Sequence, residues 1–387
     1  LDVNLFTPLQ RPADDVNSDI VTSHFDYHSI DASLVKLDLL GHDDPTVIRM
    51  LEDITGVDAR KIRLDDPETL SLFSSAEVLN LDPDILDMEV GSLGIPEFGT
   101  KFVRQMLTDT RPQAFSELVR ISGFSHGTDV WLNNAQDLIR SGTARLAEAI
   151  STRDDIMVYL LQKEMEPLSA FRIMEDVRKG KGLKPEYEEA MRAAGVPAWY
   201  IESCRKIKYM FPKAHAVAYV TMAFRIAWFK VNHPEAFYAA YFTVRADEFD
   251  LEVVLKGPEE IRKALKAIDA LPRPSAREKS VYTILELALE MYARGIRMLP
   301  LDLDKSQATR FVIGEKTLLP PFNALAGLGE KAARAVVESR EEKPFASVDD
   351  LRIRGRLSAT LMDKLREMGV LEGLPESEQM SLFEAMA

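Results

Sequence analysis

The sequence Arg-Lys-Ile-Lys-Tyr-Met-Phe-Pro-Lys-Ala-His at residues 205–215 decides how the middle of the chain is interpreted. Its bases are interleaved with Tyr209 and Phe211, so it can hold phosphate groups while a ring stacks on a nucleobase. Lys213 and His215 begin the next expected helix, and a helix N-terminus attracts anions. An amphipathic helix whose basic side chains only cover apolar surface is the alternative. His215 alone would also fit a core or capping histidine.

Charge is spread unevenly along the chain, whose 387 residues carry a net charge of −14. Residues 1–100 hold 21 acids and 6 bases, whereas the other residues hold 41 acids and 42 bases. Residues 203–234 contain six bases and no acid. Salt screens fields beyond about 10 Å, so the local charge decides contact with a polyanion. Arg205 and Lys208 are one turn apart on an expected helix and would share its face.

Composition excludes several protein classes. The chain is 46% apolar and 28% charged, which is typical of a soluble globular protein. Its single cysteine, Cys204, excludes an intrachain disulfide and a cysteine-cluster zinc site. No apolar stretch reaches the roughly 18–20 residues that a membrane span needs. We expect a cytoplasmic protein with no membrane partner, and the Leu-Asp-Val start indicates a piece of a longer polypeptide.

Periodicity predicts a mainly α fold with a small β component. Asp-Asp-Pro at residues 43–45 and again at 65–67 places an acidic cap and a proline before helical apolar spacing. Strands are expected over 33–40 and within 297–320, where Leu299, Leu301 and Leu303 alternate with other residues. Further helices are expected near 98–109, 113–121, 131–139, 143–150, 153–163, 167–179, 184–194, 198–210, 214–231, 234–242, 257–269 and 276–293, followed by a helical unit over 323–372.

Lys36 and Asp38 would point to the same side of the strand expected at 33–40, because strand side chains alternate between faces. The other face is apolar. Two charged side chains on such a strand are unfavourable for folding unless they pair with each other or bind a ligand. It is therefore either an ion pair at a sheet edge or a carboxylate that holds Mg²⁺ with a lysine beside it for a phosphate.

A second basic cluster lies at the expected end of a helix, in Arg-Lys-Gly-Lys-Gly at residues 178–182. Glycine ends helices, and bases suit their negative C-terminal end, so the cluster could be purely structural. The alternative is that Arg178, Lys179 and Lys181 bind a triphosphate.

Two motifs near the C-terminus indicate partners. Gly327-Leu328-Gly329 between two short expected helices, followed by Lys331, is the pattern of a helix-hairpin-helix, whose backbone amides hold DNA phosphates without reading sequence. A plain turn between helices could look the same. Gln379-Met380-Ser381-Leu382-Phe383 lies in an acidic tail, and its apolar residues suit a partner's pocket; a frayed chain end is the alternative.

Nearly the whole chain resembles the C-terminal part of the alpha subunit of bacterial DNA polymerase III, of the PolC type. The resemblance lies in Thr-Ser-His-Phe-Asp-Tyr-His-Ser-Ile at 22–30 and Lys-Leu-Asp-Leu-Leu-Gly-His-Asp-Asp-Pro at 36–45. It continues in Ser-His-Gly-Thr-Asp-Val-Trp at 125–131 and Lys-Tyr-Met-Phe-Pro-Lys-Ala-His-Ala at 208–216. The segment 379–383 looks like a sliding-clamp motif.

The resemblance implies template-directed nucleotidyl transfer with two Mg²⁺ ions. Asp38 would be the third palm carboxylate that holds them, and Lys36 a catalytic palm lysine near the primer end. The incoming nucleotide would contact fingers residues, with Tyr209 stacking on the new base pair. The implied nucleotide-binding residues are Arg178, Lys179, Lys181, Arg205, Lys208, Tyr209, Lys213 and His215.

The resemblance also implies the domain order. Residues 1–45 would end the palm, 46–245 would form the fingers, and 246–373 a duplex-binding domain with Gly327, Gly329 and Lys331 on DNA. A flexible tail, 374–387, would bind the beta sliding clamp. The implied partners are primer-template DNA, deoxynucleoside triphosphates, the clamp and other replisome subunits.

One feature of the family is not found. Its paired palm aspartates form an Asp-x-Asp strand, whereas Asp82–Asp84 and Asp302–Asp304 have only the spacing. With one of three metal carboxylates, the isolated chain is expected to be inactive. The rival hypothesis is a non-catalytic protein that binds duplex DNA through its hairpin and a partner through its tail.

Overall fold

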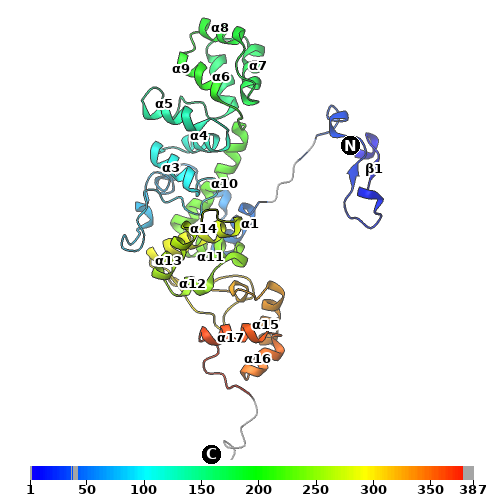
Figure 1. Cartoon of the computed structure of the whole chain (residues 1–387), viewed down its shortest axis with the longest axis vertical. Coiled ribbons are helices and arrows are strands. Elements are labelled where there is room, and N and C mark those ends of the chain that lie inside the picture. The colour runs from blue at the N-terminus through cyan, green and yellow to red at the C-terminus, as the bar shows by residue number, and fades with distance from the viewer. Residues whose placement is uncertain (1, 36, 38–41, 378–387) are drawn as a thin grey trace, which may run out of the picture. The chain divides into compact units, whose positions relative to one another are not determined.

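The structure is a computed structural model that describes residues 2–35, 37 and 42–377 (Figure 1). The chain divides into two units, Leu1–His42 and Asp43–Ala387. The larger unit is mainly helical, so the expected fold class is confirmed. None of the described helices combines the length and apolar character that crossing a membrane requires.

The N-terminal unit is built on short turns and one small hairpin. Its strands are antiparallel, with Leu9 opposite Ser23. Thr7 is the one buried residue among the described residues of this unit. Its elements are η1 (Val3–Leu5), β1 (Leu9–Gln10), η2 (Pro12–Asp14), β2 (Thr22–Ser23) and η3 (Tyr27–Ser29).

The strand expected over 33–40 is not formed by the described part of that segment. Val35 and Leu37 have no strand conformation, and their side chains are 86% and 78% exposed. The apolar pattern there has no neighbouring strand among the described residues to supply backbone hydrogen bonds, and a lone strand is unstable in water. Lys36 and Asp38 lie outside the described residues.

The first part of the larger unit consists of helices. The helix from Pro67 begins at its expected acidic cap, whereas the earlier one begins at Asp44, before the expected proline, and Asp43 makes no side-chain cap hydrogen bond. Asp66 accepts a hydrogen bond from the Thr69 amide at 2.9 Å, and α1 ends at Gly56 in the left-handed conformation. Its elements are α1 (Asp44–Thr55), η4 (Ala59–Lys61), α2 (Pro67–Ser71), η5 (Glu77–Leu79), α3 (Lys101–Thr110), α4 (Phe115–His126), η6 (Trp131–Ala135), α5 (Gln136–Arg140), α6 (Arg153–Gln162), α7 (Pro167–Arg178), α8 (Pro185–Ala193) and α9 (Ala198–Lys206).

Two expected helices in this part are wrong. Residues 143–150 form turns, because the Glu148 carboxylate binds the Arg145 amide at 2.9 Å and closes a local turn instead. The helix expected over 198–210 ends at Lys206. Phe211 precedes Pro212, and helical backbone is disfavoured for the residue before a proline. In addition, Tyr209 pairs with Thr128 from a distant part of the chain.

Helix α10 (Lys213–Asn232) lies between the earlier helices and those that follow (Figure 1). It packs against α1, α2, α4, α6 and α11. The elements after it are α11 (Pro234–Val244), η7 (Ala246–Glu248), α12 (Leu251–Leu255), α13 (Pro258–Asp269) and α14 (Ala276–Ala293).

The C-terminal part holds a small sheet and three helices. The strand order is β3-β5-β4, with β3 parallel and β4 antiparallel to β5. The alternating leucines from Leu299 are not a strand, because Pro300 lacks an amide hydrogen and the Asp302 side chain binds the next amides in a turn. The elements are β3 (Arg297–Met298), β4 (Val312–Gly314), β5 (Thr317–Leu319), η8 (Phe322–Ala324), α15 (Glu330–Glu342), α16 (Val348–Arg354) and α17 (Ala359–Glu367).

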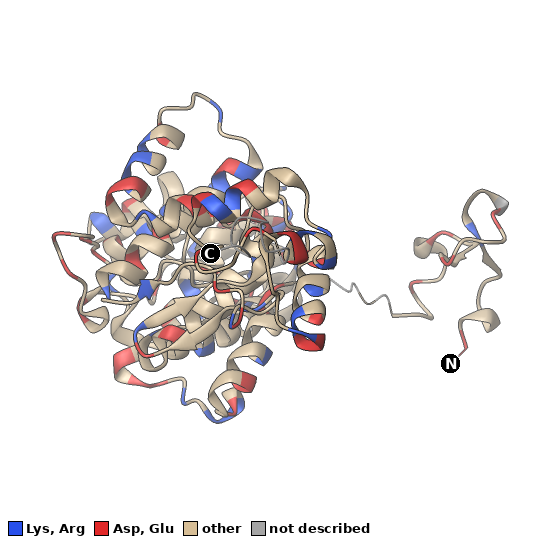
Figure 2. Ribbon diagram, turned by 90° about the horizontal axis from the view of Figure 1, so that it is seen from below, with Lys and Arg blue, Asp and Glu red and all other residues tan. Residues whose placement is uncertain are grey.

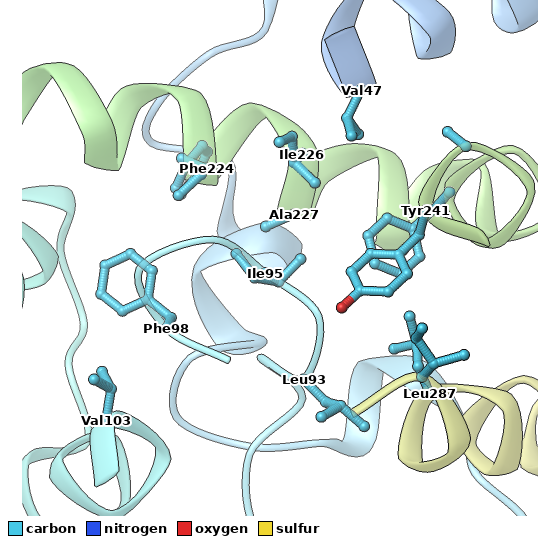
Figure 3. Packing of buried hydrophobic residues seen from close by; sticks show 14 of the residues in the cluster. Val47, Leu93, Ile95, Phe98, Val103, Phe224, Ile226, Ala227, Tyr241 and Leu287 are labelled. Atoms are coloured by element: carbon cyan, nitrogen blue, oxygen red, sulfur yellow. The ribbon is translucent and has the colours of Figure 1, made fainter. Parts of the chain in front are cut away.

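The hydrophobic core of the larger unit gathers side chains from helices that are distant in sequence (Figure 3). Figure 3 shows that α1, the loop at 93–98, α3, α10, α11 and α14 all contribute. The labelled residues are Val47, Leu93, Ile95, Phe98, Val103, Phe224, Ile226, Ala227, Tyr241 and Leu287. Charged residues of both signs are distributed along the outer helices (Figure 2).

A buried ion pair and its hydrogen bonds join four of these core elements. Lys230 on α10 has 0% exposed side chain and donates to Glu290 on α14 at 2.8 Å. Its ammonium group also donates to the carbonyls of Gly91 and Leu93 at 2.7 and 2.6 Å. The Tyr238 hydroxyl on α11 donates to the same carboxylate at 2.6 Å. Burial lowers the pKa of Lys230, and Glu290 opposes that shift.

Replacing Lys230 with methionine is expected to lower the free energy of unfolding by about 3–5 kcal/mol, because it leaves a buried carboxylate without its cation and two carbonyls without their donor. Denaturant unfolding of this chain measures the change. Lys256→Met is the matched control, since Lys256 is exposed and forms no ion pair among the described residues. A loss below 1 kcal/mol would contradict the structural importance of the pair.

Candidate nucleotide-binding face

Residues 207–212 run as an extended segment between α9 and α10. The Lys208 amide donates to the Thr128 carbonyl at 3.0 Å, and the Thr128 amide donates to the Tyr209 carbonyl at 3.0 Å. Lys208 is therefore beyond the end of α9. The expectation that it shares a helical face with Arg205 is wrong, because the pairing with Thr128 holds this segment extended.

The other edge of this segment contacts the end of α7. The Met210 amide donates to the Arg178 carbonyl at 3.3 Å. Gly180 has φ +68° and packs directly on the Lys208 carbonyl, where a Cβ would collide with the backbone. A glycine is therefore required at this contact. The structure brings together the two basic clusters that the sequence suggested separately.

The sequence Ser-His-Gly-Thr at residues 125–128 forms a third part of the face. A Cβ on Gly127 would lie 2.9 Å from the Tyr209 carbonyl and would also collide with Val130. Reasoning from the sequence found these residues only through the resemblance and assigned them no role. We name the surface formed by residues 125–128, 178–182 and 207–213 the cationic face.

Glu175 neutralises two of the predicted cations. Its carboxylate accepts two hydrogen bonds from Arg178, one of them at 2.9 Å, and lies 3.0 Å from the Lys179 ammonium. The hydrogen bond from Arg178 holds the pKa of Glu175 at about 2. The spacing of three and four residues on a helix is the signal that could have predicted these pairs.

Two other predicted cations also have acidic partners. Lys181 lies 3.7 Å from Asp176, and Arg205 contacts both Glu188 and Glu202. The hydrogen bond to Glu188 raises the pKa of Arg205. These cations meet a phosphate only in competition with a carboxylate.

Lys213 is paired with a buried carboxylate on α6. Its ammonium lies 3.2 Å from Asp155, and its backbone amide donates to Asp154 at 2.6 Å. Asp155 also accepts from the Ser151 hydroxyl at 2.6 Å and from Arg120 at 3.3 Å. Burial would raise the pKa of Asp155, but Arg120, these hydrogen bonds and Lys213 together lower it. Sequence reasoning missed this cluster, because its members come from separate segments.

Lys208 and Tyr209 are exposed members of the cationic face that form no ion pair in the described part of the chain, whereas the exposed Lys179, Lys181 and Lys213 each lie beside a carboxylate. Lys208 is exposed and lies within ion-pair distance of no carboxylate in the described part of the chain. The Tyr209 side chain is 44% exposed. One ammonium group and one ring are thus available to a ligand without breaking an ion pair.

His215 lies in a group of rings at the start of α10. Its ring centroid is 4.9 Å from that of Phe211 and 4.4 Å from that of Tyr219. His126 contacts Phe211 and places its Nε2 3.1 Å from the buried Glu97 carboxylate. His215 therefore packs in a group of rings at the edge of the cationic face, and its contact with nucleotide stays a prediction.

The hairpin at Gly327 and Gly329 exposes its backbone. Gly327 has φ +96°, Gly329 caps α15, and both are exposed together with Lys331, while Leu328 is buried. The element before the hairpin is the single turn η8 rather than the expected helix. Pro321 lacks an amide hydrogen, and only a few residues separate it from Gly327, so only one turn forms. The exposed amides can approach a phosphate.

The residues predicted to hold the metal and to bind the sliding clamp lie outside the part of the chain that the structure describes. Asp38 lies outside the described residues, and so do Gln379, Met380, Ser381, Leu382 and Phe383. Within the described ranges, no group of three His, Cys, Asp or Glu residues could hold a metal ion. We therefore assign no metal contact to the described residues.

Comparison with known families agrees with this architecture. Residues 44–196 match the bacterial DNA polymerase III alpha subunit finger domain, and residues 295–380 match a helix-hairpin-helix motif. The two matches identify the chain as part of a bacterial DNA polymerase III alpha subunit.

The resemblance to the PolC type is confirmed over nearly the whole chain. DNA polymerase III PolC-type of Caldanaerobacter subterraneus subsp. tengcongensis is 61% identical over 98% of this chain, and that of Clostridium perfringens is 57% identical over 98%. The Bacillus subtilis protein of the same name is 55% identical over 99%. The chain spans only 27%, 26% and 27% of these relatives.

Replacing Asp155 with asparagine is expected to lower the free energy of unfolding at pH 7 by about 1–3 kcal/mol, because it weakens a buried set of hydrogen bonds. The pKa of Asp155 is lowered by folding, so its ionised form stabilises the chain above pH 3.8. That contribution disappears as the pH falls through the folded pKa.

Denaturant unfolding at several pH values measures this effect. The difference between the wild type and Asp155→Asn should shrink as the pH falls below 3.8. Asp137→Asn is the control, because Asp137 is exposed and unpaired among the described residues. A difference that stays constant with pH would reject the assignment.

Proposed function

We propose that this chain supplies nucleotide binding, duplex binding and clamp binding to a replicative DNA polymerase of the PolC type in the cytoplasm. The observation that carries the proposal is the cationic face, where three segments distant in sequence meet around the accessible Lys208 and Tyr209. The names of the relatives and the two family matches support the same assignment. Residues 46–245 would act as fingers, and residues 1–45 as the end of the palm.

The cationic face would hold the incoming deoxynucleoside triphosphate. Lys208 would contact its phosphates first, since this ammonium has no competing carboxylate among the described residues. Arg178 and Lys179 adjoin it and would add charge once they leave Glu175. The positive end of the α10 helix dipole, near Lys213, also favours an anion. Tyr209 would stack on the base pair being formed.

Magnesium belongs to the same proposal. In such reactions two metal ions stabilise the attacking and leaving oxygens. Asp38 as a metal ligand and Lys36 beside the primer end stay predictions, and the remaining carboxylates would have to come from outside this chain. This chain's described cations would orient the triphosphate and neutralise its charge.

The hairpin would hold the duplex behind the reaction site. Amides at Gly327 and Gly329, with Lys331, would contact backbone phosphates, so binding should weaken as salt rises. The rival, a non-catalytic DNA-binding protein, explains this hairpin but gives no reason for the cationic face. Nucleotide dependence separates the two hypotheses.

Lys208→Ala in the full-length polymerase is expected to raise the KM for deoxynucleoside triphosphate about ten-fold, because a charge-assisted phosphate contact is lost. Steady-state primer extension measures it. Lys61→Ala is the control, since Lys61 is exposed and forms no ion pair in the described ranges. Unchanged kinetics would reject the nucleotide assignment and favour the rival.

Leu382→Ala combined with Phe383→Ala is expected to abolish binding to the beta sliding clamp, because the two apolar anchors of the motif are removed. Gel filtration or surface plasmon resonance with purified clamp measures it. Glu384→Gln provides the control within the same tail. Binding as tight as that of the wild type would show that the tail does not carry the clamp contact.

A further inference from the structure

Glu175 occupies an unusual place beside the cationic face. One carboxylate, with a side chain 20% exposed, faces both the Arg178 guanidinium and the Lys179 ammonium. Asp176, the next residue, lies 3.7 and 3.8 Å from Lys181 and Lys184, beyond hydrogen-bond distance. Glu175 is therefore the carboxylate that makes close contact with two proposed phosphate ligands at once.

The backbone segment that carries these two cations lies against the segment that carries Lys208. The Met210 amide donates to the Arg178 carbonyl, and Gly180 packs on the Lys208 carbonyl. The segments that carry Arg178, Lys179 and Lys208 are thus in direct backbone contact. A chain of phosphates bound at Lys208 would therefore lie beside the pair that Glu175 holds.

Carboxylate and phosphate compete for the same donors. Arginine forms bidentate hydrogen bonds with either group, and a polyphosphate carries more charge than one carboxylate. Its attraction for the two cations is correspondingly larger. Exchange needs only side-chain rotation, because both cations stand on long flexible stems. When the polyphosphate leaves, the carboxylate is in place to recover them.

We propose that Glu175 is an internal counter-ion that competes with bound polyphosphate for Arg178 and Lys179, and thereby limits how tightly the site holds nucleotide and the pyrophosphate product. This inference rests on the nucleotide site proposed above. Glu175 is a positioning residue that touches neither the substrate nor the reacting atoms. Its contribution is faster release of pyrophosphate at the expense of nucleotide affinity.

Glu175→Gln in the full-length polymerase tests the proposal, because it removes the charge and keeps the shape. The KM for deoxynucleoside triphosphate and the inhibition constant for inorganic pyrophosphate should both fall about three- to five-fold, as expected for loss of a partly exposed ion pair. Glu175→Asp, which keeps the carboxylate, should stay close to the wild type. Glu189→Gln is the matched control on the next helix, exposed and unpaired among the described residues.

Each outcome has a distinct meaning. If Glu175→Gln raises the KM or leaves both constants unchanged, while Lys208→Ala still raises the KM, Glu175 is only a helix-terminal ion pair and the proposal is wrong. The nucleotide site then still stands. If Lys208→Ala also has no effect, both proposals fail. Should Glu175→Gln not fold, the Arg178→Lys variant, which loses bidentate pairing to Glu175, must still alter the pyrophosphate constant.

Discussion

The buried contact between Lys230 and Glu290 is the constraint on which the larger unit depends. One ammonium group replaces its lost hydration with a carboxylate and two loop carbonyls, and Tyr238 completes the carboxylate's partners. Burying charge is unfavourable unless every partner is in place. The network therefore fixes α10, α11, α14 and the loop after residue 90 in one arrangement, which the apolar contacts of Figure 3 then fill.

Helix α10 connects this buried network to the cationic face. Lys230 lies near its C-terminal end, while Lys213 and His215 begin its first turn. The ring of His215 packs on Phe211, so the extended segment 207–212 is held against the helix start. The His215 ring thus helps to determine where Lys208 and Tyr209 lie. Helix α10 therefore contributes both to the stability of the core and to the geometry of the cationic face.

Local sequence patterns predicted most helices, because caps and apolar spacing act within a few residues. They failed where distant segments decide the backbone: the helix from Ala198 stops early because Lys208 pairs with Thr128. The bases of the site were visible in the sequence, and so was the spacing of Glu175 to Arg178. The partnership of Asp155 with Lys213 was not, because two separate helices create it. Nothing local predicts such a pair.

Distant segments also change the charge balance that the sequence predicted for the site. Counting residues 203–234 suggested a positive field undiluted by acids, but the fold brings Glu188 against Arg205 and Asp155 against Lys213. In the neighbouring basic cluster, Glu175 pairs with Lys179. The face is therefore nearly balanced, with its uncompensated charge at Lys208. A polyphosphate bound at Lys208 would gain the other cations of the face only by displacing their carboxylate partners. Under the proposed function, affinity at this face would be a difference between two sets of ion pairs, so nucleotide and product would leave faster than from an unopposed cluster of cations.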